Sequence, residues 1–420
     1  MRIIRTQLLT GMLIGLAMLV GGCQSAAEQK ADQAVLAYSM GNYDQARILL
    51  EPLARQTDEN FVLNNARLGS TALLQYRLSE AQDAFLRAYE VINSVGVNDG
   101  GRSLGAALID EKIKVWKGEP FERVMVNFYL GLIYYAQHDY ANARAAFENA
   151  LFKLRDYGTS DDKSDKYSEV ESNFTLGYIM LGKSWQRLGE PEKAQSMFDR
   201  AVKLRPDLAE LANAEYNQES NLLLVVDWGQ GPQKQTNYDG AIVGFGPKPL
   251  EAGPIYLPRV VVDGRSSASD PVAKPAVDLL GLAQDRRWES IDTIRTIKTT
   301  VGTGLMVAGA YEATRGRDRD TGLGVGLLAA GLLLKATSHA DMRQWEMLPR
   351  SVFVIPLKVP AGVHTVTVAF RDGSQQTWHN LPVAATGETT YYMHMTPWTT
   401  GEFSWPPPSL TAAAGPVANR

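Results

Sequence analysis

The sequence contains very little cysteine and histidine. Cys23 is the one cysteine among 420 residues, and the five histidines are scattered singly. No disulfide can therefore form within the chain, and a zinc site, which needs several Cys or His ligands close together, is not expected. We predict neither a metal nor a cofactor. A surplus of basic residues is also lacking, since 42 Lys and Arg stand against 46 Asp and Glu, and this balance argues against nucleic-acid binding.

The charges are unevenly divided along the chain. Residues 221–420 carry 18 basic and 17 acidic side chains, whereas residues 23–220 carry 22 basic and 29 acidic ones. With 45% apolar residues, the chain is long and apolar enough to form two or three folded domains. The two halves therefore differ in electrostatic character.

The first 22 residues have the pattern of a signal peptide. Arg2 and Arg5 give a positive start, and the apolar stretch from Leu8 to Val20 is too short to cross about 30 Å of hydrocarbon comfortably. Val20-Gly21-Gly22-Cys23 then resembles the lipobox of bacterial lipoproteins. The resemblance implies cleavage before Cys23 and lipidation of that cysteine. With Gln24 as the next residue, it also implies sorting to the outer membrane, facing the periplasm.

Four segments between residues 33 and 219 share a helix–turn–helix pattern of about 34 residues. The first, around Gly41–Ala46, is the weakest copy. The recurring positions of the others are Gly69, Ala81 and Phe85; Gly131, Tyr134, Ala143 and Phe147; and Gly182, Trp185, Ala194 and Phe198, with Pro206 at the end. We predict that the glycines allow a close helix approach, the alanines lie where helices cross, and the phenylalanines fill the space between repeats. Pro206 is expected to end the last helix.

This pattern resembles the tetratricopeptide repeat (TPR). The resemblance implies a curved helical array whose concave face binds an extended or helical segment of another protein. It also implies a role in protein binding rather than catalysis.

After residue 219 the helical periodicity gives way to strand patterns. Strands are predicted at 221–227, 255–262, 276–280, 352–359, 363–370, 375–379 and 389–395. The predicted fold class is α+β: an all-α TPR-like solenoid over 33–219 and a small antiparallel β-sandwich over 220–398. Residues 23–32 are predicted as a lipidated N-terminus with a short linker, and 399–420 as a disordered Pro/Ala-rich tail.

Two glycine pairs follow the first predicted strand. Gly229–Pro232 begins with Gly-x-Gly, but Pro232 and the lack of a third glycine argue against a dinucleotide-binding loop. We predict turns at 229–232 and 244–248. A secondary hypothesis is that Lys234 and Lys248 hold an anion between them.

A glycine-rich segment lies between the two groups of strands. Residues 300–337 form two apolar Gly/Ala-rich arms around the charged turn 315–320, which predicts a helical hairpin. Small-residue faces of this kind are frequent in membrane helices, although each arm is short for spanning. Two interpretations stay open: a hairpin buried against the sheet, and a hairpin that touches membrane or self-associates.

Six residues form a candidate functional cluster: Glu119, Glu122, Arg123, Asp341, Arg343 and Trp345. The first three open the third repeat, where Pro120 suits a helix start. The others belong to an Ala-Asp-x-Arg-x-Trp-x-x-Leu-Pro element at 340–349. With this element and its TPR-like first half, the chain resembles an uncharacterised family of bacterial envelope lipoproteins. An ion pair between Asp341 and Arg343, tying the hairpin to the sandwich, is the alternative to a functional site.

The leading hypothesis for function is a non-enzymatic lipoprotein, anchored by its N-terminal lipid, that organises a protein partner at the periplasmic face. A second hypothesis is a membrane-active or export-assembly component that uses the glycine-rich hairpin. A third is an enzyme with a site between the two domains that uses Glu119, Glu122, Arg123 or Asp341, and clustering of Asp341 with the glutamates in one cleft would favour it.

Overall fold

The computed structural model describes residues 25–93, 115–155, 172–237, 242–247, 254–266, 274–284, 341–397 and 399–411. The predicted signal peptide, Cys23, Lys248 and the glycine-rich segment 300–337 lie outside these ranges.

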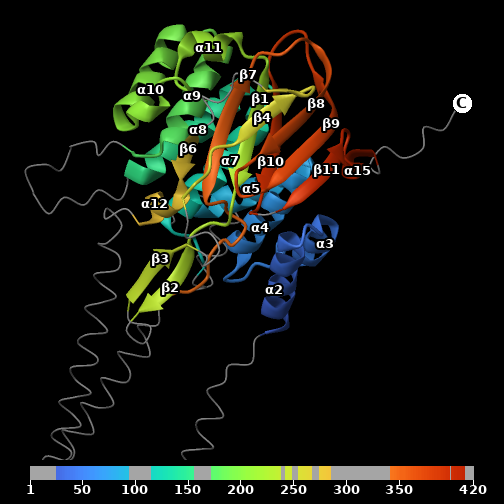
Figure 1. Ribbon diagram of the computed structural model, residues 1–420. Coiled ribbons are helices and arrows are strands. Elements are labelled where there is room, and N and C mark those ends of the chain that lie inside the picture. Colours follow the sequence, from blue (N-terminus) through green and yellow to red (C-terminus); the bar gives the residue numbers. More distant parts are fainter. Residues whose placement is uncertain are drawn as a thin grey trace, which may run out of the picture.

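The described residues between 26 and 204 form helices that pack in pairs along the chain (Figure 1). The pairs are α2 (Ala26–Ser39) with α3 (Tyr43–Leu53), α4 (Phe61–Leu74) with α5 (Leu78–Asn93), α7 (Pro120–Ala136) with α8 (Tyr140–Arg155), and α9 (Thr175–Arg187) with α10 (Pro191–Leu204). A 3₁₀ turn, Pro206–Leu208, and α11 (Ala214–Glu219) follow. The predicted α+β fold, a helical repeat region followed by a strand-rich region, is confirmed.

Glycine and phenylalanine determine how closely the paired helices approach. A Cβ added to Gly131 would lie 2.6 Å from the ring of Phe147, and one added to Gly182 would lie 2.6 Å from Phe198. Gly69 meets Phe85 in the same way, at 2.8 Å. The repeat alanines Ala81, Ala143 and Ala194 are fully buried. Only glycine fits where the ring of the second helix lies on the backbone of the first.

The other predicted repeat positions lie nearer the surface. Tyr134 is partly buried against the core. The ring of Trp185 has the guanidinium of Arg144 5.0 Å from its centroid and the ammonium of Lys193 at 4.5 Å. α10 ends at Leu204, and only Arg205 lies between this end and Pro206.

The turns inside the helix pairs each hold a residue with positive φ: Gly41, Tyr76, His138 and Gly189. This conformation suits glycine and is uncommon for tyrosine. The Tyr76 hydroxyl donates to the carbonyl of Tyr392 at 2.6 Å, and a ring nitrogen of His138 lies 3.1 Å from the carbonyl of Glu388. Two of these turns are therefore held by the strand region.

The strands form two main sheets and a hairpin. They are β1 (Leu222–Trp228), β2 (Gln233–Asn237), β3 (Ile242–Gly246), β4 (Arg259–Val262), β5 (Arg265–Ser266), β6 (Pro275–Asp278), β7 (Ser351–Leu357), β8 (Gly362–Ala369), β9 (Gln375–Val383), β10 (Thr389–Met395) and β11 (Thr400–Ser404). The strand orders are β10-β1-β7-β6 and β11-β9-β8-β4-β5, and β2 pairs with β3.

The prediction of a purely antiparallel sandwich was wrong. β1 pairs parallel to β10, and β11 pairs parallel to β9. Parallel neighbours need a crossover connection. For β1 and β10, the connection contains most of the strand-rich region. For β9 and β11, the connection contains β10, which belongs to the other sheet.

The first sheet is covered on both faces, so the molecule has three layers (Figure 1). In β1, Leu223 and Val225 belong to the core shared with the helices, whereas Leu222, Leu224 and Val226 face the core shared with the second sheet. Such double coverage explains why β1 is a continuous apolar run.

Several predicted boundaries also need correction. Residues 26–32, expected in a linker, belong to α2, because Ser25 and Glu28 form a capping box at its start. Residues 400–411, expected in a disordered tail, contain β11 and α15 (Pro408–Thr411).

Inside the strand region three shorter predictions were wrong. Gly244 and Gly246 lie in β3 rather than in a turn. The strand predicted at 255–262 begins only at Arg259. The strand predicted at 276–280 ends at Asp278, whose side chain caps α12 (Leu279–Ala283).

Candidate functional site

The predicted cluster assembles at the N-terminus of α7. The Glu122 carboxylate accepts the backbone N–H of Glu119 at 2.7 Å and that of Trp345 at 2.6 Å. Lys234 places its ammonium 2.8 Å from the Glu119 carboxylate and donates to the carbonyl of Asp341 at 2.9 Å. These five residues come from three distant parts of the sequence.

The segment 341–350, here called the strap, is fastened to the helices along its length. Arg343 forms an ion pair with Asp341 at 2.7 Å and donates to the carbonyl of Glu59 at 2.8 Å. Through Arg343, the Asp341–Arg343 pair ties the strap to the residues before α4. The prediction was that this pair ties the glycine-rich hairpin to the sandwich, and that hairpin lies outside the described residues. Arg123 lies partly buried on α7.

The centre of the strap is inserted into the helical core. Trp345 is 2% exposed, with its ring 5.9 Å from that of Phe85 and 5.8 Å from that of Tyr129. Arg67 on α4 forms a two-point ion pair with Glu346, at 2.6 and 2.9 Å. The strap therefore links the second and third helix pairs.

The contacts of this cluster hold the strap against α7, and they do not suit proton transfer. Burial raises the pKa of Glu122 to about 7, with Lys234 opposing the rise. A raised carboxyl pKa can mark a catalytic acid. However, Glu122 is 1% exposed and each of its oxygens accepts a backbone N–H, so the carboxylate has no face directed at a substrate.

A second buried carboxylate, Asp227, was missed by the sequence analysis. It is fully buried on β1 and accepts hydroxyl hydrogen bonds from Tyr129 on α7 at 2.5 Å and from Tyr392 on β10 at 2.7 Å. Burial raises its pKa to about 7, and the two tyrosine bonds oppose the rise. The available signal was an aspartate inside the apolar run 222–228.

A third network joins α9 to the turn before β10. Glu388, fully buried, accepts from Tyr135 at 2.7 Å and lies 3.0 Å from the ammonium of Lys183 and 3.2 Å from the guanidinium of Arg187. Burial alone would raise the pKa of Glu388, but the two cations outweigh it and lower the pKa. The sequence signal for this network was Lys183, a charged residue on an otherwise apolar face of α9, and it was overlooked.

These networks lie where a TPR array would bind its partner. Three of the four first helices, which line the concave face in such arrays, are covered by the chain's own sheet: α4 and α7 contact β10, and α9 contacts β6. In α4 every residue from Phe61 to Leu73 is buried. At α4, α7 and α9 the chain's own sheet therefore occupies the concave face that was predicted to bind a partner, whereas α2, whose Val35 and Tyr38 line an open hollow, is not covered in this way.

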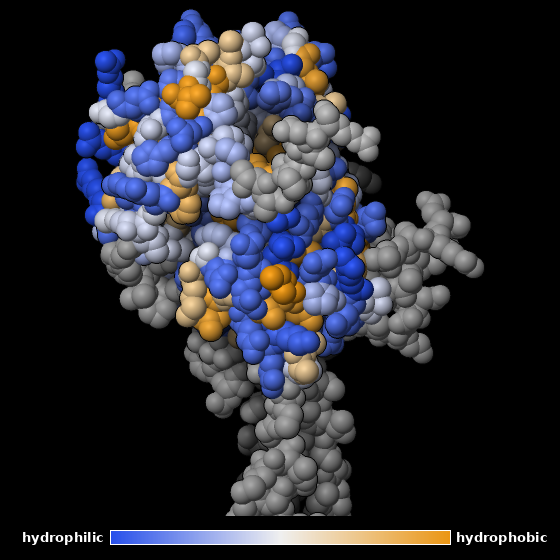
Figure 2. All heavy atoms as spheres, turned by 90° about the vertical axis from the view of Figure 1, so that its right-hand side faces the viewer, coloured by the Kyte–Doolittle hydropathy of each residue, from blue (hydrophilic) through white to orange (hydrophobic). Residues whose placement is uncertain are grey.

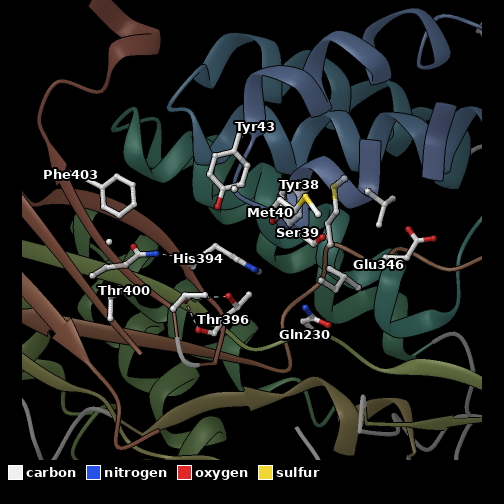
Figure 3. Close-up of a pocket in the computed structure, with 17 residues that line it drawn as sticks. Tyr38, Ser39, Met40, Tyr43, Gln230, Glu346, His394, Thr396, Thr400 and Phe403 are labelled. Atoms are coloured by element: carbon white, nitrogen blue, oxygen red, sulfur yellow. Dashed lines mark hydrogen bonds between the residues drawn. The ribbon is translucent and has the colours of Figure 1, made fainter. Parts of the chain in front are cut away.

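A hollow remains open beside this interface (Figure 3). It has a volume of about 250 Å³, with Tyr38 and Tyr43 from the first helix pair on one side and His394 and Phe403 from the strands on the other. A second hollow of about 180 Å³ adjoins it and shares Tyr43, Gln376, His394 and Phe403. Together these two hollows are the edge groove.

Comparison with known proteins agrees with the repeat pattern. Residues 177–208, which include most of α9 and all of α10, match the tetratricopeptide repeat. The repeat is present. No curated protein matches the sequence.

Similar solved structures are a crystal structure of MamA and that of TTC0263, a thermophilic TPR protein from Thermus thermophilus. The MamA structure is 13% identical, with 47% of this chain and 82% of that chain covered and a TM-score of 0.30. TTC0263 is 15% identical, with 44% and 95% covered and a TM-score of 0.21.

Two further observations concern the described residues. Their side chains include no group of His, Cys, Asp and Glu arranged to hold a metal ion. Within the same ranges, no helix has both the length and the apolar character needed to cross a membrane.

Proposed function

We propose that this protein is a lipid-anchored, non-enzymatic scaffold of the bacterial cell envelope that binds a protein partner at the periplasmic face of the outer membrane. The single observation that carries the proposal is the helical repeat array, since TPR repeats suggest protein–protein interaction. The sheet covers α4, α7 and α9, so the partner meets the outer helices or the edge groove beside α2.

The N-terminal sequence supports the anchoring. α2 begins at Ala26, three residues after Cys23, and Ser25 already caps it. Acyl chains on Cys23 would hold the first helix pair next to the bilayer, because the intervening chain is only a few residues long. The edge groove, which this helix pair lines, would then lie near the membrane surface.

The anchoring is tested by a Cys23→Ser variant expressed with a radiolabelled fatty acid. The natural chain should incorporate the label and fractionate with the outer membrane, whereas the variant should do neither. Full membrane association of the cleaved variant would refute the lipid anchor. Partner binding is tested separately, by in-cell photo-crosslinking from positions on the outer helices and in the edge groove.

A further inference from the structure

The edge groove is bordered by Thr400, Gly401 and Phe403 of β11, an edge strand of the second sheet. β11 pairs with β9 on one side and stands last in the order β11-β9-β8-β4-β5; in the described ranges no strand pairs with its other side. Four of its five residues are exposed. An exposed strand edge offers backbone N–H and C=O groups to an incoming strand.

The walls of the groove are aromatic. Tyr38 packs edge-on against Tyr43 and His394, with centroids at 5.5 and 5.6 Å, and Phe403 stacks on Trp378 at 4.8 Å. These walls would accommodate an apolar side chain.

The charge of the groove has one sign. Asp44 lines one hollow and Glu402 is exposed on β11 itself, whereas the charge of Glu346, which lines the other hollow, is balanced by Arg67. None of the described residues that line either hollow is a lysine or an arginine. A partner segment with basic side chains therefore complements the groove.

The lip of the groove is apolar. Leu36 is 54% exposed and Met40 is 74% exposed, both near the end of α2, and Met40 also lines the first hollow. Figure 2 shows the side of the molecule that is on the right in Figure 1, where apolar groups form small patches within a mostly hydrophilic surface. Met40 therefore adds exposed apolar surface to the rim of the first hollow.

We propose that the edge groove binds an extended segment of a partner protein, with basic and apolar residues in alternation, which adds to the free edge of β11 as a further strand. Alternate residues of a strand point to opposite faces. The set that faces the hollow would contact Tyr43, Asp44 and Phe403, while the other set would lie on the same face as Glu402. The proposal rests on the proposed function as a scaffold and specifies its binding surface.

The test uses the mature chain with Cys23→Ser and two fluorescent synthetic peptides. In the first, lysine alternates with valine around a central phenylalanine; in the second, glutamate replaces lysine. The test variant is Asp44→Asn with Phe403→Ala, and the matched control is Glu192→Gln with Phe152→Ala on α10 and α8. Thermal unfolding of each variant checks that it is folded.

Fluorescence anisotropy should show saturable binding of the lysine peptide, about tenfold weaker for the test variant, unchanged for the control, and about tenfold weaker for the glutamate peptide. Amide exchange in 400–404 should slow on binding.

No saturable binding, equal affinity of the two variants or of the two peptides, or unchanged exchange at β11 would overturn the proposal. A dimer of the chain that the test variant dissociates would also overturn it, by making a second copy the occupant. The lipid-labelling and crosslinking experiments do not depend on these outcomes.

Discussion

Three glycine–phenylalanine contacts determine the spacing of the paired helices. Gly131→Leu places a side chain where the Phe147 ring lies, since even a Cβ there would be 2.6 Å from that ring. Overpacking of this kind should lower the free energy of unfolding by about 3 kcal/mol. Denaturant unfolding of the mature chain measures it, with Ala141→Leu on the exposed face of α8 as the control. Equal midpoints for the two variants would contradict the assigned role of Gly131.

Glu388 pairs with the buried ammonium of Lys183 and the partly buried guanidinium of Arg187, and its removal should be costly. Glu388→Gln leaves Lys183 and Arg187 without their carboxylate, and we expect a loss of about 3–5 kcal/mol in the free energy of unfolding. Glu148→Gln, which breaks the exposed pair with Arg144, should cost less than about 1 kcal/mol. A similar cost for both variants would show that the buried network contributes no more than a surface pair.

Single residues differ in how far the sequence reveals their role. Gly131 and Phe147 lie within one repeat, so their spacing alone predicts a contact. Asp227 and Tyr129 are 98 residues apart, and Glu388 and Tyr135 are 253 apart. Nothing local in the sequence pairs such residues, because their contact depends on how the sheet meets the helices.

The strap acts as one element that joins helix pairs. Trp345→Ala should leave a cavity between Phe85 and Tyr129 and lower the free energy of unfolding by about 3–5 kcal/mol. Met342→Ala on the exposed part of the strap is the control and should have little effect. The contradicting result is a Trp345→Ala chain as stable as the control, since the strap would then not be part of the core.

The junction of α7, β1 and β10 should be sensitive to pH through Asp227. Its folded-state pKa of about 7 lies above its ordinary value, so the folded chain holds a proton that the unfolded chain has released. The free energy of unfolding should therefore fall as pH rises from about 4 to about 7. Asp227→Asn keeps an oxygen for Tyr129 and Tyr392 and should be more stable than the natural chain above pH 7, by a few kcal/mol.

Urea unfolding of both chains across this pH range measures the difference. If the free energy of unfolding varied with pH in the same way for the natural chain and for Asp227→Asn, the pKa of Asp227 would not differ between the folded and the unfolded state, which contradicts the prediction.

At the level of elements, the sequence predicted helices better than strands. The helix–turn–helix repeat pattern located all four helix pairs, but β2, β3 and β11 were missed because they are short and rich in Gly, Gln or Thr. The parallel pairing of β1 with β10 could not be predicted, since both antiparallel and parallel neighbours satisfy the same apolar pattern.

The molecule as a whole is a repeat array whose inner face is closed by its own sheet. The apolar core of the helices continues into β1, β7 and β10, and the strap, Asp227 and Glu388 fasten the two parts. Under the proposed function, a partner would therefore bind elsewhere than on the surfaces that α4, α7 and α9 turn to the sheet. The two parts should unfold together, because separating them exposes apolar surface and buried charges at once.

Hydrogen exchange followed by mass spectrometry on the mature chain tests this closure most directly. Amides of α7 and α9 should exchange as slowly as those of β1, and all three should accelerate together in Glu388→Gln. Exchange in α7 and α9 that is much faster than in β1, and unaffected by Glu388→Gln, would contradict the closed inner face.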